Sequence, residues 1–179
     1  FNAGDPYGET TIDIKDNVVI ENAAGATKTS YSSAIGGAYT KKIVVNIGGN
    51  AHLGKLFGGI GSGTYVEDTT VNIGGNTKID TIESNIAAIG GKSDSGKTVR
   101  VNIDGGENGN VKLGDGDGIS GVDAVISGTE INIGDHVQIK MKQGSWNNYA
   151  RRGQYVSENN AEKELTSVSG VRDNTALWY

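Results

Sequence analysis

The hexapeptide VNIGGN occurs twice in this chain, at residues 45–50 and 71–76, and related sequences recur at steps of 33, 26, 30 and 30 residues. Five copies align: TTIDIKDN (10–17), IVVNIGGN (43–50), TTVNIGGN (69–76), VRVNIDGG (99–106) and TEINIGDH (129–136). Repeats of this length are typical of solenoids, in which a repeat buries its apolar face only by stacking on its neighbours. The repeat therefore constrains the fold more than any other feature of the sequence.

Within each copy, apolar and polar residues alternate, and this period of two predicts a half-buried strand. One side of each strand should face the core, with threonine allowed only at its first position. The expected inward residues are Ile43, Val45 and Ile47; Thr69, Val71 and Ile73; Val99, Val101 and Ile103; and Thr129, Ile131 and Ile133.

Two further short strands are expected in each repeat. The second strands would be Val18–Ile20, Ala51–Leu53, Thr77–Ile79, Val111–Leu113 and Val137–Ile139. The third, glycine-ended segments would be SAIGG (33–37), LFGGIG (56–61), AAIGG (87–91), and either GISG (118–121) or AVISG (124–128). Three short strands per repeat predict an all-β fold, a parallel β-helix of about five rungs over residues 1–140.

The charges of neighbouring copies support this alignment. It places Lys42 above Asp68 and Arg100 above Glu130. Opposite charges on adjacent strands are favourable, whereas like charges are penalised, so a wrong register is not expected to produce such pairs.

Residues 141–179 depart from the pattern and are polar, with a short helix expected near Ser157–Leu165. We expect this tail to cap the open end of the solenoid or to begin an adjoining segment. The chain starts at Phe1 rather than Met, and we interpret it as a monomeric fragment of a larger multidomain chain.

The composition argues against several functions. A net charge of −5 gives no basic surface for nucleic acid. No apolar run approaches the roughly 20 residues of a membrane span, so membrane insertion is not expected. The chain has no cysteine, which excludes a thiol nucleophile.

The alternation of AIGG, a polar link and VxVNIGGN over about residues 10–140 resembles the repeats of large surface proteins of Gram-positive bacteria, especially gut commensals. It is less specifically similar to the β-helical passenger domains of autotransporter adhesins. This resemblance implies a right-handed β-helix, an extracellular location on a bacterial cell surface, and a role as an adhesin or binding protein.

Asparagines recur at one outward position of the strands. The column contains Asn46, Asn72, Asn102 and Asn132, with Asp13 at its end. Such a row could bind a sugar chain or an extended peptide, and we include Asn46 and Asn72 among the candidate ligand-binding residues. It could equally be structural, with stacked amides bonded to one another. Asn50 and Asn76, which follow Gly-Gly, are interpreted as turn residues that tolerate a left-handed backbone.

Most aromatic residues lie outside the repeated strands, with Phe57 as an exception. Exposed Tyr and Trp supply rigid contact area for recognition, although they could instead cover corners of the solenoid. Tyr39 and Tyr65 share an offset from their strand asparagines and should stack on adjacent rungs. The aromatic candidates for ligand binding are Tyr31, Tyr39, Tyr65, Trp146, Tyr149 and Tyr155.

Catalytic and metal sites have little support in the sequence. Asp115, Asp117 and Asp123 could supply oxygen ligands for Ca²⁺, but their spacing fits neither an EF-hand nor a calcium-binding nonapeptide, so no cofactor is expected. His52 and His136 stand at different offsets in their repeats and need not meet. We therefore expect no enzymatic activity.

The leading hypothesis is a binding module that recognises a host protein, such as a secreted immunoglobulin, or a mucosal glycan through loops and one sheet face. The main alternative is a structural stalk without a ligand. A polysaccharide lyase or hydrolase is the third, and it would need the three aspartates to be catalytic or to bind Ca²⁺.

Overall fold

All secondary-structure elements of the described residues are β-strands. The structure, a computed structural model, describes residues 7–24, 33–36, 40–61, 67–85, 87–91, 97–121, 124–140, 142, 150–151 and 154–157. In the described part of the chain, no helix is long and apolar enough to cross a membrane.

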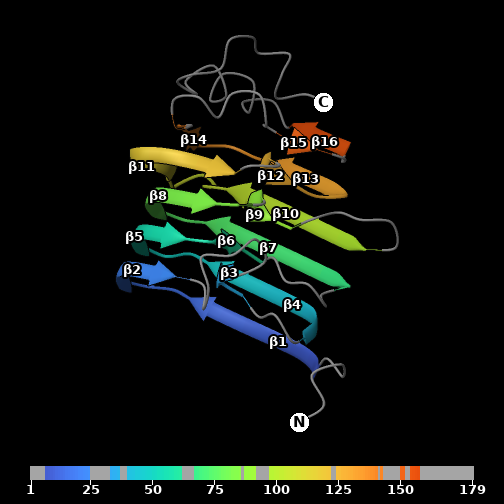
Figure 1. Ribbon diagram of the computed structural model, residues 1–179. Coiled ribbons are helices and arrows are strands. Elements are labelled where there is room, and N and C mark those ends of the chain that lie inside the picture. Colours follow the sequence, from blue (N-terminus) through green and yellow to red (C-terminus); the bar gives the residue numbers. More distant parts are fainter. Residues whose placement is uncertain are drawn as a thin grey trace.

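The strands form three parallel sheets that run along one column (Figure 1). Sheet A consists of β1 (Tyr7–Ile14), β4 (Thr40–Ile47), β7 (Asp68–Gly74), β10 (Thr98–Asp104), β13 (Glu130–Ile133) and β16 (Gln154–Ser157). Sheet B consists of β2 (Val19–Ala24), β5 (His52–Phe57), β8 (Lys78–Ser84), β11 (Val111–Gly121) and β14 (Val137–Ile139). Sheet C consists of β3 (Ser33–Ile35), β6 (Gly59–Ile60), β9 (Ala87–Gly90), β12 (Ala124–Ser127) and β15 (Ala150–Arg151).

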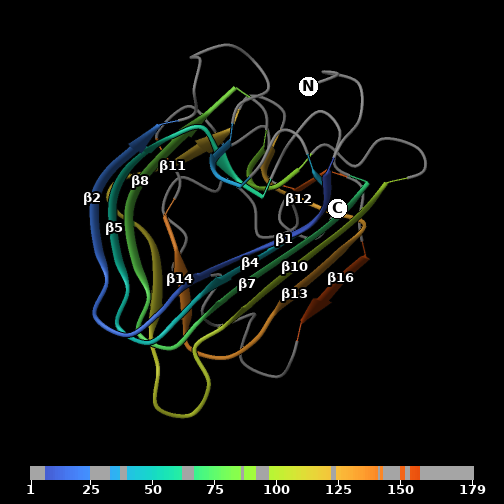
Figure 2. The same ribbon diagram turned by 90° about the horizontal axis from the view of Figure 1, so that it is seen from below.

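The chain visits sheets A, B and C in turn, and each strand pairs with the equivalent strand of the next turn. Figure 2 looks along the column from its N-terminal end, and the chain winds clockwise as it recedes from the viewer. That is a right-handed winding. The predicted right-handed parallel β-helix is therefore confirmed, with five three-strand turns among the described strands and a sixth strand in sheet A.

The register predicted from the asparagine column is also confirmed. Asn46 pairs with Asn72, and Asn102 pairs with both Asn72 and Asn132. Lys42 lies opposite Asp68 as predicted, but its Nζ contacts Glu9 on the other neighbouring strand, at 3.0 Å.

Arg100 has two acidic neighbours. Its guanidinium lies 3.4 Å from Asp68 and 3.7 Å from Glu130, so it bridges the strands on either side of its own. All three side chains are more than a third exposed, so these pairs contribute little stability and act mainly to favour this register.

The two candidates for the fourth glycine-ended segment belong to different sheets. AVISG forms β12 in sheet C, where Ile126 pairs with Ile89. GISG continues β11 in sheet B, where Ile119 pairs with Ile82. The register of β11 shifts between Leu113 and Gly118, so four residues bulge opposite a single residue of β8.

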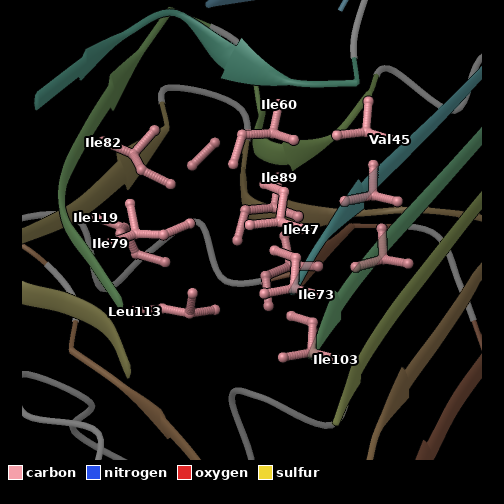
Figure 3. Close-up of a cluster of buried hydrophobic side chains, with 14 of the residues drawn as sticks. Val45, Ile47, Ile60, Ile73, Ile79, Ile82, Ile89, Ile103, Leu113 and Ile119 are labelled. Atoms are coloured by element: carbon pink, nitrogen blue, oxygen red, sulfur yellow. The ribbon is translucent and has the colours of Figure 1, made fainter. Parts of the chain in front are cut away.

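The core fills the column with branched aliphatic side chains (Figure 3). The fully buried large side chains are Ile43, Leu53, Leu56, Ile60, Ile73, Ile79, Ile82, Ile89, Ile103, Leu113, Ile119 and Ile131. Sheet A supplies the predicted inward residues with one correction. Thr129 is exposed and lies just before β13, where its hydroxyl donates to the carbonyl of Val99 at 2.9 Å and accepts from the same residue's amide at 3.0 Å.

Two short strands lie beyond residue 140. β15 pairs with β12 in sheet C, and β16 pairs with β13 in sheet A. Ser157 is the last residue of β16, and the rest of the helix expected near Ser157–Leu165 lies outside the described residues.

Glycine is required where neighbouring strands come closest. Gly90 has a φ of +93°, and a Cβ on it would collide with the backbone carbonyl of Ser127 on the adjacent strand. Gly48 differs, because a Cβ there would meet nothing closer than the carbonyl oxygen of Gly74, at 4.0 Å, and its φ lies outside the left-handed region.

This contrast gives a prediction for stability. Gly90→Ala should destabilise the fold by at least about 2 kcal/mol, because it adds both a left-handed penalty and a backbone collision. Gly48→Ala, the matched control, should change the free energy of unfolding by less than about 0.5 kcal/mol. Urea unfolding of both variants measures the difference, and equal midpoints would contradict the close approach of β9 and β12.

Candidate functional site

The strand asparagines form a continuous hydrogen-bonded ladder on the outer face of sheet A. Asn132 Nδ2 donates to Asn102 Oδ1 at 2.8 Å, and Asn102 Nδ2 donates to Asn72 Oδ1 at 2.8 Å. Asn72 donates to Asn46 at 2.7 Å, and Asn46 donates to Asp13 at 2.8 Å. The stacking interpretation of this column is confirmed. We call these five residues the amide ladder.

A carboxylate ends the amide ladder because its last position needs only an acceptor. The amide of Asn46 donates to Asp13, and Lys15 Nζ lies 3.3 Å from the same carboxylate oxygen. These two contacts lower the pKa of Asp13 below its ordinary value.

A second, exposed ladder runs along the turn between sheets A and B. Asn76 Nδ2 donates to Asn50 Oδ1, and Asn50 Nδ2 donates to Asn17 Oδ1, both at 3.1 Å. The prediction of a left-handed backbone at Asn50 and Asn76 is wrong. The left-handed residues are Gly49 and Gly75, each with a φ of 65°, because glycine adopts this conformation without steric cost.

A groove of about 440 Å³ lies beside the amide ladder and follows the column axis. Its volume is within the range of about 300–1,000 Å³ that is usual for small-molecule sites. Its lining residues come from β4, β7, β10 and the turns after β1 and β4: Lys15, Asp16, Asn46, Ile47, Gly48, Gly49, Asn72, Ile73, Gly74, Asn102 and Asp104. Both predicted site residues with described side chains, Asn46 and Asn72, therefore face one groove.

Two glycines leave space for this groove. The outward position two residues after the first four ladder residues is occupied by Lys15, Gly48, Gly74 and Asp104 on successive turns, and Gly134 after Asn132 is not part of the groove lining. Gly48 and Gly74 have no side chain, so the backbone is accessible between the larger side chains before and after them. Sequence reasoning missed this floor because it considered the outward asparagines and not the glycines two residues after them. The signal was present as two small residues at equal offsets in adjacent repeats.

The aromatic candidates cannot be placed beside the groove. Tyr31, Tyr39, Tyr65, Trp146 and Tyr149 lie outside the described residues. Tyr155 belongs to β16, where its backbone pairs with Ile131. Phe57, the last residue of β5, lies on the outer face of sheet B and is 40% exposed.

A separate group of charged side chains covers part of sheet B. His52 Nε2 lies 3.0 Å from Asp80 Oδ2, and Lys78 Nζ lies 3.4 Å from Asp80 Oδ1. Lys78 also contacts Asp115 Oδ2 at 3.0 Å. This contact raises the pKa of Lys78, with a further contribution from the charge of Asp80, and it lowers the pKa of Asp115.

The bulge of β11 explains how Asp115 reaches Lys78. Four residues of β11 lie opposite one residue of β8, and this insertion directs a carboxylate over the neighbouring strand. Asp123 lies outside the described residues, so its proximity to Asp115 and Asp117 is not defined. In the described part of the chain, no three histidine or acidic side chains gather as a metal site would require.

The two histidines are separated by three strand positions in sheet B. His52 begins β5, whereas His136 immediately precedes β14 at the far end of the same sheet. His136 has a φ of 55° and occupies a turn. The expectation that they need not meet is therefore confirmed.

No family model matches this chain, and no curated protein or solved structure with which it was compared matches it either. The groove, the two ladders and the charged group on sheet B are therefore the features from which function is inferred.

The amide ladder gives a second prediction. Asn72→Ala removes two partly buried amide hydrogen bonds and should destabilise the fold by about 1–2 kcal/mol. Asn50→Ala removes two hydrogen bonds of the exposed ladder and should cost less than about 0.5 kcal/mol, because water replaces them. Chemical denaturation of the two variants distinguishes the ladders, and an equal loss in both would contradict the difference in burial.

Asp13 gives a prediction about pH. Because its pKa is lower in the folded protein, its ionised form favours folding above the ordinary value of 3.8, and this contribution is lost as the pH falls through the folded value. Asp13→Asn removes the titrating group. The Tm of the variant should therefore decrease less than that of the native protein between about pH 5 and about pH 2. Parallel Tm curves in a thermal scan series would refute the assigned role of Asp13.

Proposed function

We propose that this chain is a non-catalytic binding module of a bacterial cell-surface protein, and that the groove beside the amide ladder takes up its ligand. The observation that supports this proposal most directly is the open groove of about 440 Å³, whose lining includes three ladder asparagines together with Gly48, Gly49 and Gly74. A host protein and a mucosal glycan are the two ligand classes.

The surroundings of the groove suit a preformed site. Its floor belongs to strands whose inward side chains, including Val45, Val71 and Val101, are fully buried. The ladder amides are held in place by one another. Little ordering should therefore be required when a ligand binds, which favours affinity.

A structural stalk is the second candidate, and the two hydrogen-bonded ladders favour it. Both run along the column axis and tie successive turns together at the surface. A stalk needs this axial continuity but needs no ligand, so blocking the groove should leave its function unchanged.

The groove can be blocked without altering its hydrogen bonds. Gly48→Leu places a side chain in the floor, at a register position where the neighbouring turns carry glycine and lysine. Gly8→Leu is the matched control. A Cβ on Gly8 meets nothing within 4 Å, and Gly8 lies in β1, outside the groove lining.

The test passes mucosal secretions over the immobilised native protein and both variants. We expect a component to be retained by the native protein and Gly8→Leu, and to be lost from Gly48→Leu. Enzymatic deglycosylation of the secretions then separates a glycan, whose retention disappears, from a protein, whose retention survives. No retention on any surface would contradict the proposal and favour the stalk.

A further inference from the structure

The groove beside the amide ladder has a repeat of its own, because equivalent residues recur on successive strands of sheet A. Parallel strands lie about 4.8 Å apart, so Asn46, Asn72 and Asn102 present their amides at that interval along the column axis. A ligand lying along the groove meets the same chemical group once per strand.

Each ladder amide retains hydrogen-bonding capacity. An asparagine side chain has two N–H donors and an oxygen with two lone pairs. Asn72 uses one donor on Asn46 and one lone pair on Asn102. One donor and one lone pair remain on a partly exposed side chain. Hydroxyl groups both donate and accept, and they match this combination.

The middle of the groove is uncharged. Between its ends, β4, the turn after it and β7 contribute only asparagine, isoleucine and glycine to the lining. The charged lining residues lie at its two ends. At β10, Asp104 Oδ1 accepts from the Gly106 amide at 2.8 Å, and after β1 the lining contains Asp16 and Lys15, of which Lys15 contacts Asp13. A neutral polar ligand therefore fits better than an anion or a cation.

The spacing of the ladder asparagines also distinguishes an extended polysaccharide from an extended peptide. One sugar unit of an extended polysaccharide spans nearly the same length as the strand spacing of about 4.8 Å. An extended peptide rises about 3.3 Å per residue and repeats each face after about 6.6 Å, so its side chains lose step with the ladder. Peptides that add to sheets bind at a free strand edge, whereas this groove lies on a sheet face.

The glycine floor gives a ring access to the backbone. A Cβ on Gly48 would meet nothing closer than 4.0 Å, so this part of the floor is open. Lys15 and Asp104 occupy the same register position on the turns before Gly48 and after Gly74. They bound the open floor to the width of about two strands.

We infer that the groove binds a neutral, linear polysaccharide whose chain lies parallel to the column axis, with one sugar unit per strand. This inference rests on the proposed function, and it narrows the ligand to one polymer class and one orientation. Asn46, Asn72 and Asn102 would bind successive sugar units, and Gly48 and Gly74 would lie beneath the rings.

The test uses an array of neutral linear oligosaccharides with defined linkages, from monosaccharide to hexasaccharide, together with neutral polar peptides of matched length. Affinity for the best series should rise up to about the trisaccharide and then become constant, because Asn46, Asn72 and Asn102 each face one sugar unit at about 4.8 Å per strand. Gly48→Leu should weaken binding at least about tenfold, and Gly8→Leu should leave it unchanged.

Each contrary result identifies what has failed. If no sugar on the array binds, or if binding is independent of chain length, the inference is overturned. Sugar binding that Gly48→Leu does not affect would also overturn it, because the site would then lie elsewhere while the binding function remains. Peptide binding that Gly48→Leu abolishes would refute the polysaccharide but preserve the groove as the site. Retention of a component from mucosal secretions is measured separately and reports on the proposed function alone.

Discussion

Parallel, in-register pairing of equivalent strands is the constraint on which the rest of this structure depends. Each residue lies beside the residues at the same position one turn earlier and one turn later, as the pairing of Val45 with Val71 illustrates. The side chain at each position must therefore be compatible with an equivalent side chain on each adjacent turn. Aliphatic side chains satisfy this condition inside the column by packing together, and asparagines satisfy it outside because an amide is both donor and acceptor.

Charged residues cannot satisfy the same condition, since like charges on adjacent strands repel. On sheet A the chain alternates their sign, as in the contacts of Lys42 with Glu9 and of Arg100 with Asp68 and Glu130. On sheet B, His52, Lys78 and Lys112 are in register with one another. There the side chains of the column contact carboxylates that lie outside it. Asp80 on β8 contacts His52, and Asp115 from the bulge of β11 contacts Lys78. The bulge thus has an electrostatic consequence that a regular strand would not provide.

The sequence was sufficient to predict the fold class, the strands and the sheet A register, because alternation and offset from the strand asparagine are local properties that repeat. It was insufficient where a turn departs from the others. Thr129 was expected inside because its copy was treated as regular, although β13 begins only at Glu130. The bulge depends on how β11 fits between two neighbours, and the pairing of Asp115 with Lys78 follows from it. Local patterns do not contain that information. The left-handed positions were misassigned by one residue because each turn contains both glycine and asparagine, and glycine adopts this conformation at the lower steric cost.

The candidate site results from the in-register stacking of equivalent residues, together with two positions at which charged residues interrupt a column of glycine. A perfectly regular outer column of lysine or aspartate would repel itself, and a perfectly regular column of glycine would leave an unbroken trough along the sheet. Here Lys15 and Asp104 bracket Gly48 and Gly74, so the trough is bounded at both ends while the amide ladder continues past it. The regular asparagine column provides hydrogen-bonding groups at a constant interval. The two charged residues, Lys15 and Asp104, limit the length of the groove. The length of any ligand held there is therefore limited by Lys15 and Asp104. A larger residue at Gly74 would shorten the site and would also press on its neighbour, because its Cβ would lie 3.0 Å from the carbonyl oxygen of Asp104.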